Sequence, residues 1–328
     1  MARPEHRDHP ERLDPTRTLV PVRALTLLAG RPVLVLSGAG VSTDSGIPDY
    51  RGPGSPARRP MTYQEFVGAP AARRRYWARS HLGWTRMGTA RPNAGHHALA
   101  RLEAAGRVGL LVTQNVDGLH EAAGSRRVCA LHGRIADVVC LDCRTRSRRS
   151  ALAHRLTELN PGWAERHADV ASRPDGDVEL DDTEEFVVPG CERCGGVLKP
   201  DVVFFGENVP RRRVDRCYTA VDRLAELGGA MLVVGSSLTV MSGFRFVRHA
   251  SRLGTPVVIV NRGETRADDL ATVKLEQGTS QFLAAWAESA DVAPDGQQQP
   301  ERAEERGVPE QDEAAGPPVE VVQERVAR

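Results

Sequence analysis

Five short apolar runs constrain the fold of this 328-residue chain more than any other feature. Each run is almost continuously apolar, the pattern of strands that are buried on both faces of a parallel sheet. Helical patterns lie between several runs, for example at 96–106 and 214–229. This alternation predicts an α/β fold with a Rossmann-like, doubly wound parallel sheet, which binds ligands beyond the carboxyl ends of its strands. The runs are residues 32–40, 108–118, 202–207, 230–238 and 256–263.

The runs and the composition between them divide the chain into a central domain and two tails. Residues 1–20 and 289–328 are polar and charged, and the second segment is rich in Pro, Gln and Glu, so we expect both tails to be disordered. Two stretches interrupt the α/β pattern, and we expect them to form a small helical insertion and a separate cysteine-containing lobe. The predicted ranges are 21–288 for the domain, 21–52, 90–137 and 199–288 for its core, 53–89 for the insertion and 138–198 for the lobe.

Charge and hydropathy exclude some function classes. The formal net charge is +1, which gives no reason to expect nucleic acid or membrane as the main partner. The arginine clusters at 72–79 and 144–149 are better explained as solvated faces than as nucleic-acid patches. No apolar run approaches the roughly 20 residues of a membrane helix. The N-terminal segment has no apolar stretch of the kind that a secretory signal needs, so we expect a cytoplasmic protein.

Four of the six cysteines form two CxxC pairs. Two such pairs indicate a tetrahedral zinc site with four thiolate ligands, and a site filled by protein ligands is structural because it leaves no position for water. A redox dithiol is the alternative, although it leaves one pair unexplained. The other two cysteines, Cys129 and Cys217, are expected to be buried free thiols. The predicted zinc ligands are Cys140, Cys143, Cys191 and Cys194.

A glycine-rich turn directly follows the first apolar run. Gly38 and Gly40 allow the backbone to approach a phosphate closely and leave N–H groups free to point at it. Gly46 comes too late for the GxGxxG fingerprint of many dehydrogenases. A tight turn without a ligand would also explain the glycines. The Pro, acid, aromatic and Arg at 48–51 are more than such a turn needs.

Polar residues follow the later runs as well. Gln114–Asp117 could bond ribose hydroxyls and a carboxamide, or could form an Asx turn. The hydroxyls and glycine at 235–237 and the Asn at 261 suit a phosphate or ribose, or an ordinary turn. His132 could be a general base because imidazole titrates near neutrality, although a lone histidine is more often structural. The valines and phenylalanines at 202–205 could line a slot for a neutral acyl-lysine beside an extended peptide, or form a buried strand.

These motifs, in this order, resemble the sirtuin family of NAD-dependent protein-lysine deacylases. Residues 37–52 are similar to the NAD-binding loop of that family nearly residue for residue, and the likeness covers roughly residues 25 to 285. The segments at 76–79, 92–99, 113–120, 125–127 and 140–143 are most like the class II branch. The other matching motifs are TQNVDGLH, LHG, KPDVVFFGE, VGSSLTV and VNRG.

The resemblance implies roles for individual residues. His132 is the catalytic base, and Asn115 and Asp117 hold the nicotinamide-ribose end of NAD. Val203, Phe205 and Gly206 line the acyl-lysine slot, and the zinc ion is structural. The implied NAD contacts are Gly38, Ala39, Gly40, Ser42, Ile47, Pro48, Asp49, Tyr50, Arg51, Gln114, Asn115, Val116, Asp117, Gly235, Ser236, Ser237, Asn261, Arg262, Gly263 and Thr279, with Asn115 also counted as catalytic.

The resemblance also implies a reaction in which NAD is consumed. The acyl oxygen of a modified lysine attacks the ribose carbon that bears nicotinamide, and nicotinamide leaves. His132 then takes a proton from a ribose hydroxyl, and that hydroxyl oxygen attacks the acyl carbon. Water completes the release of lysine and of O-acyl-ADP-ribose. The expected partners are therefore acyl-lysine proteins or peptides and NAD.

Two other functions fit the same residues, and the acyl group is open. A mono-ADP-ribosyltransferase could use the same fold, and so could a non-catalytic module that binds NAD and zinc. Family members that remove negatively charged acyl groups carry a Tyr-x-x-Arg pair, which Tyr76 and Arg79 match in spacing. The distance from Tyr76 to the Pro92 segment is longer than in that branch, so the pair is a hypothesis to be tested.

Overall fold

The computed structural model describes residues 15–49, 60–167, 180 and 183–291. Residues 15–20, which we expected in the N-terminal tail, belong to a helix, and the last helix ends at Asp291. The rest of the two predicted tails lies outside the described residues, as do Tyr50 and Arg51. Within the described part of the chain, no helix is both long and apolar enough to cross a membrane.

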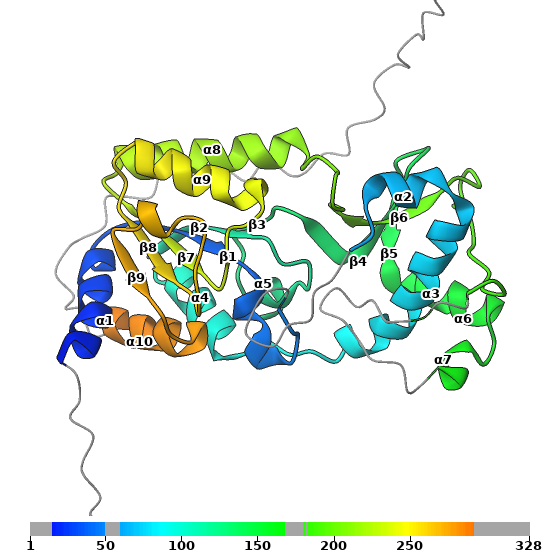
Figure 1. Ribbon diagram of the computed structural model, residues 1–328, viewed down its shortest axis with the longest axis horizontal. Coiled ribbons are helices and arrows are strands. Elements are labelled where there is room, and N and C mark those ends of the chain that lie inside the picture. Colours follow the sequence, from blue (N-terminus) through cyan, green and yellow to red (C-terminus); the bar gives the residue numbers. More distant parts are fainter. Residues whose placement is uncertain (1–14, 50–59, 168–179, 181–182, 292–328) are drawn as a thin grey trace, which may run out of the picture. The chain divides into compact units, whose positions relative to one another are not determined.

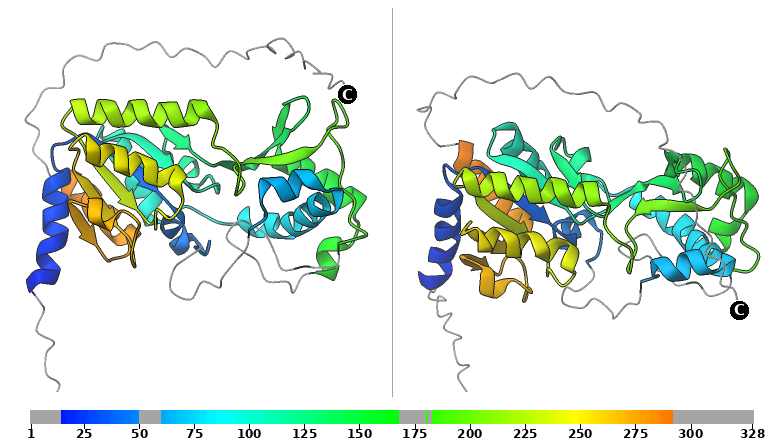
Figure 2. Two further views of the ribbon diagram at one scale, coloured as in Figure 1. Left: turned by 45° about the horizontal axis from the view of Figure 1, so that its top comes forward. Right: turned by 90° about the horizontal axis from the view of Figure 1, so that it is seen from above.

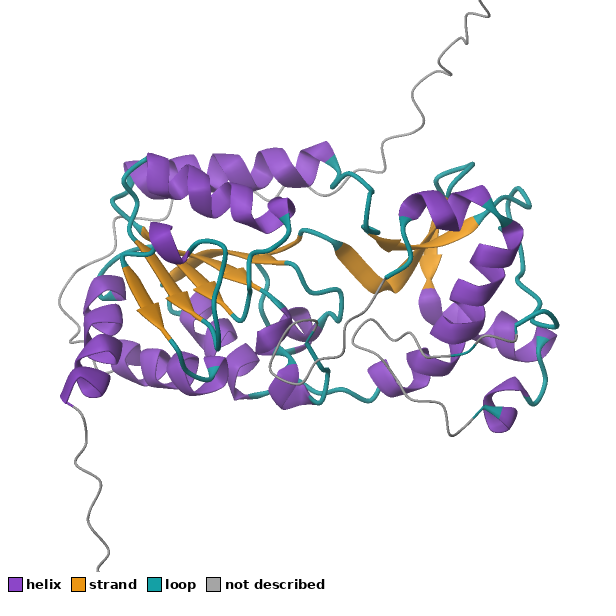
Figure 3. Ribbon diagram, viewed as in Figure 1, coloured by secondary structure: helices purple, strands orange, loops and turns teal. Residues whose placement is uncertain are grey.

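A six-stranded sheet with the order β3-β2-β1-β7-β8-β9 forms the large lobe, and all of its adjacent pairs are parallel. It confirms the predicted parallel sheet. Helices cover both of its faces, as Figures 1 and 3 show. The strands are β1 (Val33–Ser37), β2 (Val108–Thr113), β3 (Val128–Ala130), β7 (Ala230–Val234), β8 (Val257–Val260) and β9 (Val273–Leu275). The helices of this lobe are α1 (Pro15–Leu28), α4 (Ala94–Ala104), α5 (Leu119–Ala122), α8 (Arg211–Glu226), α9 (Met241–Arg252) and α10 (Thr279–Asp291), with 3-10 turns η1 (Ala39–Val41), η2 (Thr43–Ser45) and η3 (Asp268–Leu270).

Alternate residues of β1 divide the core of the large lobe into two layers. Val33 and Val35 pack with α1, α4 and α10, whereas Leu34 and Leu36 pack with α8 and α9. Figure 2 shows α8 and α9 lying side by side on their face of the sheet. Burial on both faces explains why these strands are continuously apolar in the sequence. The loops that leave the strands' carboxyl ends are thereby held along one edge.

The cap of α4 connects this helix to the first loop of the sheet. Asn93 Oδ1 accepts hydrogen bonds from the N–H groups of Gly95 and His96, a cap that stabilises a helix by about 1 kcal/mol. Its amide nitrogen donates to Val41 O at 2.8 Å and to Ser45 Oγ at 3.0 Å. One side chain therefore fixes both the start of the helix and the loop after β1.

The smaller lobe is built on an antiparallel sheet with the order β5-β4-β6. Its helices α2 and α3 come from the predicted insertion, and α6 and α7 come from the predicted zinc lobe. They share one hydrophobic cluster that includes Phe66, Trp77, Leu152 and Leu198. The elements are α2 (Tyr63–Gly68), α3 (Pro70–Met87), β4 (Gly133–Cys140), β5 (Arg146–Arg148), α6 (Arg149–Leu159), α7 (Trp163–Arg166) and β6 (Leu198–Val202).

One of the five apolar runs was wrongly assigned to the parallel sheet. The run at 202–207 contains only the last residue of β6, which pairs antiparallel with β4 in the small sheet. Val202 and Phe204 are buried, whereas Phe205 is 42% exposed, so the segment has one buried side and one open side. A short apolar run looks the same in both situations, because periodicity is hard to recognise over six residues.

Candidate functional site

Two loops meet at the carboxyl edge of the parallel sheet, one after β1 and one after β7. Gly38 N–H donates to Val234 O at 3.0 Å, and Gly40 N–H donates to Gly235 O at 2.9 Å. A Cβ atom on Gly40 would lie 2.8 Å from the Cα of Gly235, and one on Gly235 would lie 2.6 Å from Val41 N. Gly235 also has φ = +61°, in the region that favours glycine. The glycines that we expected beside a phosphate are therefore also required for the contact between these loops.

A polar network joins the loop after β1 to the loop after β2. Asp117 accepts hydrogen bonds from Ser42 Oγ at 2.7 Å and from Leu119 N at 2.9 Å. The amide nitrogen of Asn115 donates to Gly38 O at 3.0 Å and to Ser42 Oγ at 3.1 Å. Burial raises the pKa of Asp117, while the bonds from Leu119 and Ser42 act in the opposite sense. The side chains of Asn115 and Asp117 are thus fixed before any ligand binds.

His132 lies between β3 and β4 with a defined tautomer. Its Nδ1 is 2.9 Å from Gln114 O. Since a carbonyl oxygen can only accept, Nδ1 carries the proton and Nε2 keeps its lone pair. Ser242 Oγ is 2.8 Å from Nε2, so its hydroxyl donates to that nitrogen. Burial is the main cause that lowers the pKa of His132 to about 4; the bond to Gln114 raises it and Arg213 lowers it further. The ring is therefore neutral at pH 7 and can accept a proton.

A cleft of about 800 Å³ brings the predicted residues together. It lies between the carboxyl edge of the parallel sheet and the smaller lobe, and most of the predicted NAD contacts line it together with His132 and the three predicted substrate residues. Thr279 does not line this cleft. It lines a smaller adjacent hollow of about 190 Å³, where its hydroxyl donates to Gly40 O at 3.1 Å. Those in the large cleft are Gly38, Ala39, Gly40, Ser42, Ile47, Pro48, Asp49, Gln114, Asn115, Val116, Asp117, His132, Val203, Phe205, Gly206, Gly235, Ser236, Ser237, Asn261, Arg262 and Gly263.

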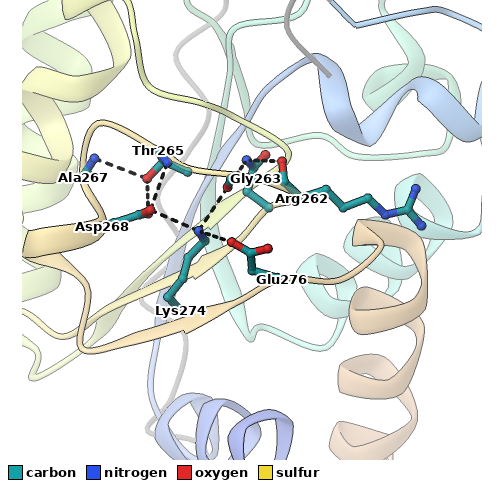
Figure 4. A network of polar contacts seen from close by, with 8 residues as sticks. Arg262, Gly263, Thr265, Ala267, Asp268, Lys274 and Glu276 are labelled. Atoms are coloured by element: carbon teal, nitrogen blue, oxygen red, sulfur yellow. Dashed lines mark hydrogen bonds and ion pairs between the residues drawn. The ribbon is translucent and has the colours of Figure 1, made fainter. Parts of the chain in front are cut away.

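Polar contacts shape the loop after β8, at the end of the cleft where the adenosine is expected (Figure 4). The amide nitrogen of Asn261 donates to Arg262 O at 2.9 Å and to Gly263 O at 3.1 Å. Lys274 Nζ donates to Gly263 O at 3.1 Å and pairs with Asp268 Oδ2 at 3.2 Å. Asn261 thus stabilises its own loop, which is the turn that the sequence left open as the alternative to a ribose contact.

The segment after β6 forms the wall on the side of the smaller lobe. Val203 N–H donates to His132 O at 2.8 Å, which places this segment beside the histidine. Phe205 O accepts from Tyr63 N–H at 2.8 Å, and Gly206 O accepts from Gln64 Nε2 at 3.2 Å. The side chain of Phe205 stays 42% exposed. An extended peptide could lie along this open side.

The four predicted zinc ligands come together. Their sulfur atoms all lie within 4.8 Å of one another, and two pairs are 3.6 and 3.7 Å apart. Thiolates about 2.3 Å from a tetrahedral zinc ion lie about 3.8 Å from each other, so the donor set fits this ion. The expected free thiols Cys129 and Cys217 are buried, and their sulfur atoms are 3.6 Å apart. The four ligands are Cys140, Cys143, Cys191 and Cys194.

Tyr76 and Arg79 both line the cleft from α3. The ring of Tyr76 packs against Phe66 and Phe204, with ring centroids 5.4 and 5.2 Å apart. Arg79 Nε donates to Leu180 O at 2.8 Å, which fixes the guanidinium near the cleft wall. The pair is positioned at the end of the cleft where the substrate segment lies.

Two cleft residues with specific contacts were not foreseen from the sequence. Ser242 contacts His132, although the two are 110 residues apart in the chain. Glu207 lies within a motif that we had noted, but its ion pair with Lys199, at 2.9 Å, carried no sequence signal of its own. Only the fold brings these partners together.

The fold and the cleft define an α/β protein with a dinucleotide-sized site, a neutral histidine at that site and a four-cysteine centre. The family model described as "Sir2 family" matches residues 38–242. The NAD-dependent protein deacetylase 1 of Mycobacterium avium is 53% identical over 273 residues, which cover 82% of this chain and 95% of that protein. The protein of that name from Streptomyces coelicolor is 57% identical over 267 residues, with 79% and 86% covered.

Solved structures agree with the sequence comparison. The structure described as "Sir2-p53 peptide-NAD+" superposes with a TM-score of 0.65 at 31% identity and covers 83% of this chain and 98% of that one. Another, described as "Structural Basis for the Mechanism and Regulation of Sir2 Enzymes", has a TM-score of 0.64 at 29% identity. The chain belongs to the Sir2 family.

Proposed function

We propose that the chain is an NAD-dependent protein-lysine deacetylase with His132 as its general base. The observation that carries the proposal is the neutral imidazole at the cleft wall, whose unprotonated Nε2 already accepts a hydrogen bond from a hydroxyl. The relatives named NAD-dependent protein deacetylase support the activity. The solved Sir2 complex with a p53 peptide and NAD+ supports acyl-lysine peptides and NAD as the two substrates.

Each part of the cleft would bind a different part of the two substrates. NAD supplies the ribose that takes the acyl group and the nicotinamide that leaves. Asn115 and Asp117 orient the nicotinamide-ribose end, because their side chains are already held by Ser42 and the loop around it. The glycine-rich loops and Asn261 face the phosphates and the adenosine. The segment 203–206 pairs with the peptide, and the zinc ion stabilises the smaller lobe.

The acyl group that this site prefers is a finer proposal. Tyr76 and Arg79 lie in the cleft wall, and a guanidinium there favours a negatively charged acyl chain such as succinyl. Their presence does not argue against acetyl-lysine, because Arg79 already has a protein partner in Leu180 O. A comparison of the two peptides decides between them.

We also propose a cytoplasmic location. None of the six cysteines forms a disulfide, although the sulfur atoms of Cys129 and Cys217 are 3.6 Å apart, and this suits a reducing compartment. Cell fractionation with an antibody to the protein checks this, and recovery in an exported fraction would contradict it.

The experiment that tests the function measures nicotinamide release from NAD with acetyl-lysine, succinyl-lysine and unmodified peptides. Wild-type protein should release nicotinamide only with an acyl peptide, in equal amounts with deacylated product. His132→Ala should reduce product formation by a factor of about 100 or more, the usual contribution of a general base. Arg79→Met should reduce turnover of the succinyl peptide but not of the acetyl peptide.

Two outcomes would redirect the proposal. Transfer of labelled ADP-ribose to protein without deacylated peptide would favour a mono-ADP-ribosyltransferase. NAD binding without any nicotinamide release would favour a non-catalytic module. Equal loss of both peptide activities in Arg79→Met, or loss of neither, would contradict the role of Arg79 in acyl selection.

A further inference from the structure

Ser242 occupies the position that the proposed general base must use. Its hydroxyl is 2.8 Å from Nε2 of His132, and Nε2 is the only ring nitrogen with a lone pair because Nδ1 donates to Gln114 O. Both residues line the cleft. A substrate hydroxyl can therefore give its proton to His132 in two ways. It can displace Ser242, or it can pass the proton through the serine oxygen.

The start of α9 is built to hold Ser242 at this position. The next residue, Gly243, is within the first turn of the helix and is buried. A Cβ atom at Gly243 would lie 2.6 Å from Oε1 of Gln114, so any larger residue here would push the Gln114 side chain from its place. Glycine in a helix costs about 1 kcal/mol relative to alanine. The close approach of α9 to Gln114 gives a physical reason for a glycine at this position.

Gln114 contacts both His132 and the first turn of α9. Gln114 O accepts from Nδ1 of His132, and its side-chain amide donates to Ser236 Oγ at 2.7 Å. The backbone of Gln114 thus fixes the ring, and its side chain packs against the helix turn that carries Ser242. Gln114 therefore contacts both the histidine ring and the helix turn that carries Ser242.

We propose that Ser242 relays the proton from the ribose hydroxyl of the substrate to His132. This inference rests on the proposed deacylase function. The ribose O–H bond breaks as its proton moves to the serine oxygen, and the proton of Ser242 moves at the same time to Nε2. The ribose oxygen keeps its electron pair and attacks the acyl carbon, Ser242 is again a neutral hydroxyl, and His132 carries one positive charge. Gln114 O stabilises that charge through its bond to Nδ1.

The test separates the step before the proton transfer from the step that needs it. Exchange of labelled nicotinamide into NAD in the presence of acyl peptide reports the first step, and formation of deacylated peptide reports the second. Ser242→Ala should slow deacylation about tenfold to a hundredfold and leave exchange within about twofold of wild type. Ser242→Thr keeps the hydroxyl and should retain most of the deacylation rate. Ser251→Ala, a half-buried serine at the other end of α9, is the control and should match wild type in both assays.

Rates in mixtures of H2O and D2O provide a readout that a merely structural role would not change. A relay moves two protons together, so the deacylation rate of wild type should curve with deuterium fraction, and that of Ser242→Ala should be linear. A linear wild-type plot, or Ser242→Ala with the wild-type deacylation rate, overturns the relay, and so does a parallel loss of exchange and deacylation in a folded Ser242→Ala protein. If wild type shows neither peptide-dependent exchange nor deacylation, the proposed function itself fails, which is a distinct result.

Discussion

At the scale of single residues, the two lysines of the chain stabilise two different segments that line the cleft. Lys199 is 3% exposed, and its ammonium pairs with Glu207 at 2.9 Å and donates to Val202 O. Glu207 also accepts from Phe204 N–H at 2.8 Å. Burial lowers the pKa of Lys199, while the bond to Glu207 and its charge act against this. This ion pair between buried Lys199 and half-buried Glu207 therefore fixes the segment on which the peptide is proposed to bind.

Lys199→Met should loosen that segment and leave Glu207 without its partner. Because Glu207 is 25% exposed and stays partly solvated, we expect the free energy of unfolding to fall by about 1.5–2 kcal/mol, the contribution of one hydrogen bond to a charged group. We expect the KM for acyl peptide to rise several-fold while the KM for NAD is unchanged. Lys274→Met is the matched variant, because Lys274 holds Gly263 O in the loop after β8, and it should raise the KM for NAD alone. Steady-state kinetics with each substrate varied in turn would show this, and identical effects of the two variants would contradict it.

How much a sequence reveals at this scale depends on whether partners are close in the chain. The place of Asn115, Asp117 and His132 in the cleft could be predicted because each lies in a short motif that matches a known family. Ser242 could not, because a serine in the first turn of a helix has many uses and its partner is distant in sequence. The packing of Gly40 on Gly235 could not be predicted either. A glycine in a sequence does not show whether it makes room for a phosphate or for a neighbouring backbone segment.

At the scale of elements, four cysteines connect two turns of the smaller lobe. Cys140 ends β4, and the second pair precedes β6, whose strand pairs with β4. Leu141 N–H donates to Val197 O at 2.8 Å, so the turns already meet in the backbone. A zinc ion at this point would hold the edge of the small sheet, and the sheet in turn carries the segment after β6.

Cys143→Ala should remove one ligand and release the ion. We expect metal analysis to give about one zinc per wild-type chain and almost none per variant, with a lower melting temperature and loss of deacylation. Cys217→Ala changes a buried thiol outside this cluster and should keep the full zinc content. Retention of zinc by Cys143→Ala, or equal loss of zinc in both variants, would contradict the assignment of these four cysteines as the zinc ligands.

Elements with both faces buried were predictable, and short ones were not. The runs that became β1, β2, β7 and β8 were foreseen as parallel strands, whereas β3 and β9, of three residues each, were missed. Three residues give too little pattern to distinguish a strand from a loop. The joint core of the insertion and the zinc lobe was also missed, because Phe66 and Leu152 are far apart in the chain and only tertiary packing unites them.

At the scale of the whole molecule, several histidines are buried in their neutral form and make stability depend on pH. Burial is the first cause that lowers the pKa of His81, His96 and His132 to about 4 and that of His120 to about 3. An unfolded histidine titrates near 6.5, so between pH 6.5 and about 4 the unfolded chain binds more protons than the folded one. The stability that these histidines contribute is therefore fully present above pH 6.5 and is lost as the pH falls toward 4.

His81 allows this effect to be measured away from the proposed catalytic site. Its ring packs beside Phe186 with centroids 6.0 Å apart, and its Nδ1 is buried with no hydrogen-bond partner among the described residues. Arg149 adds to the effect of burial on the pKa of His81, while Glu165 opposes it. His81→Phe keeps an aromatic ring and removes the titration. The difference in unfolding free energy between pH 7.5 and pH 5.0 should then shrink by about 2 kcal/mol, the linkage value for one group whose pKa falls from 6.5 to about 4. Denaturant unfolding at the two pH values measures it, with His154→Gln, on the exposed side of α6, as the control that should keep the wild-type difference. Loss of zinc in acid would affect wild type, His81→Phe and His154→Gln alike. If His81→Phe kept the wild-type difference in unfolding free energy between the two pH values, the titration of this buried histidine would not contribute to acid unfolding.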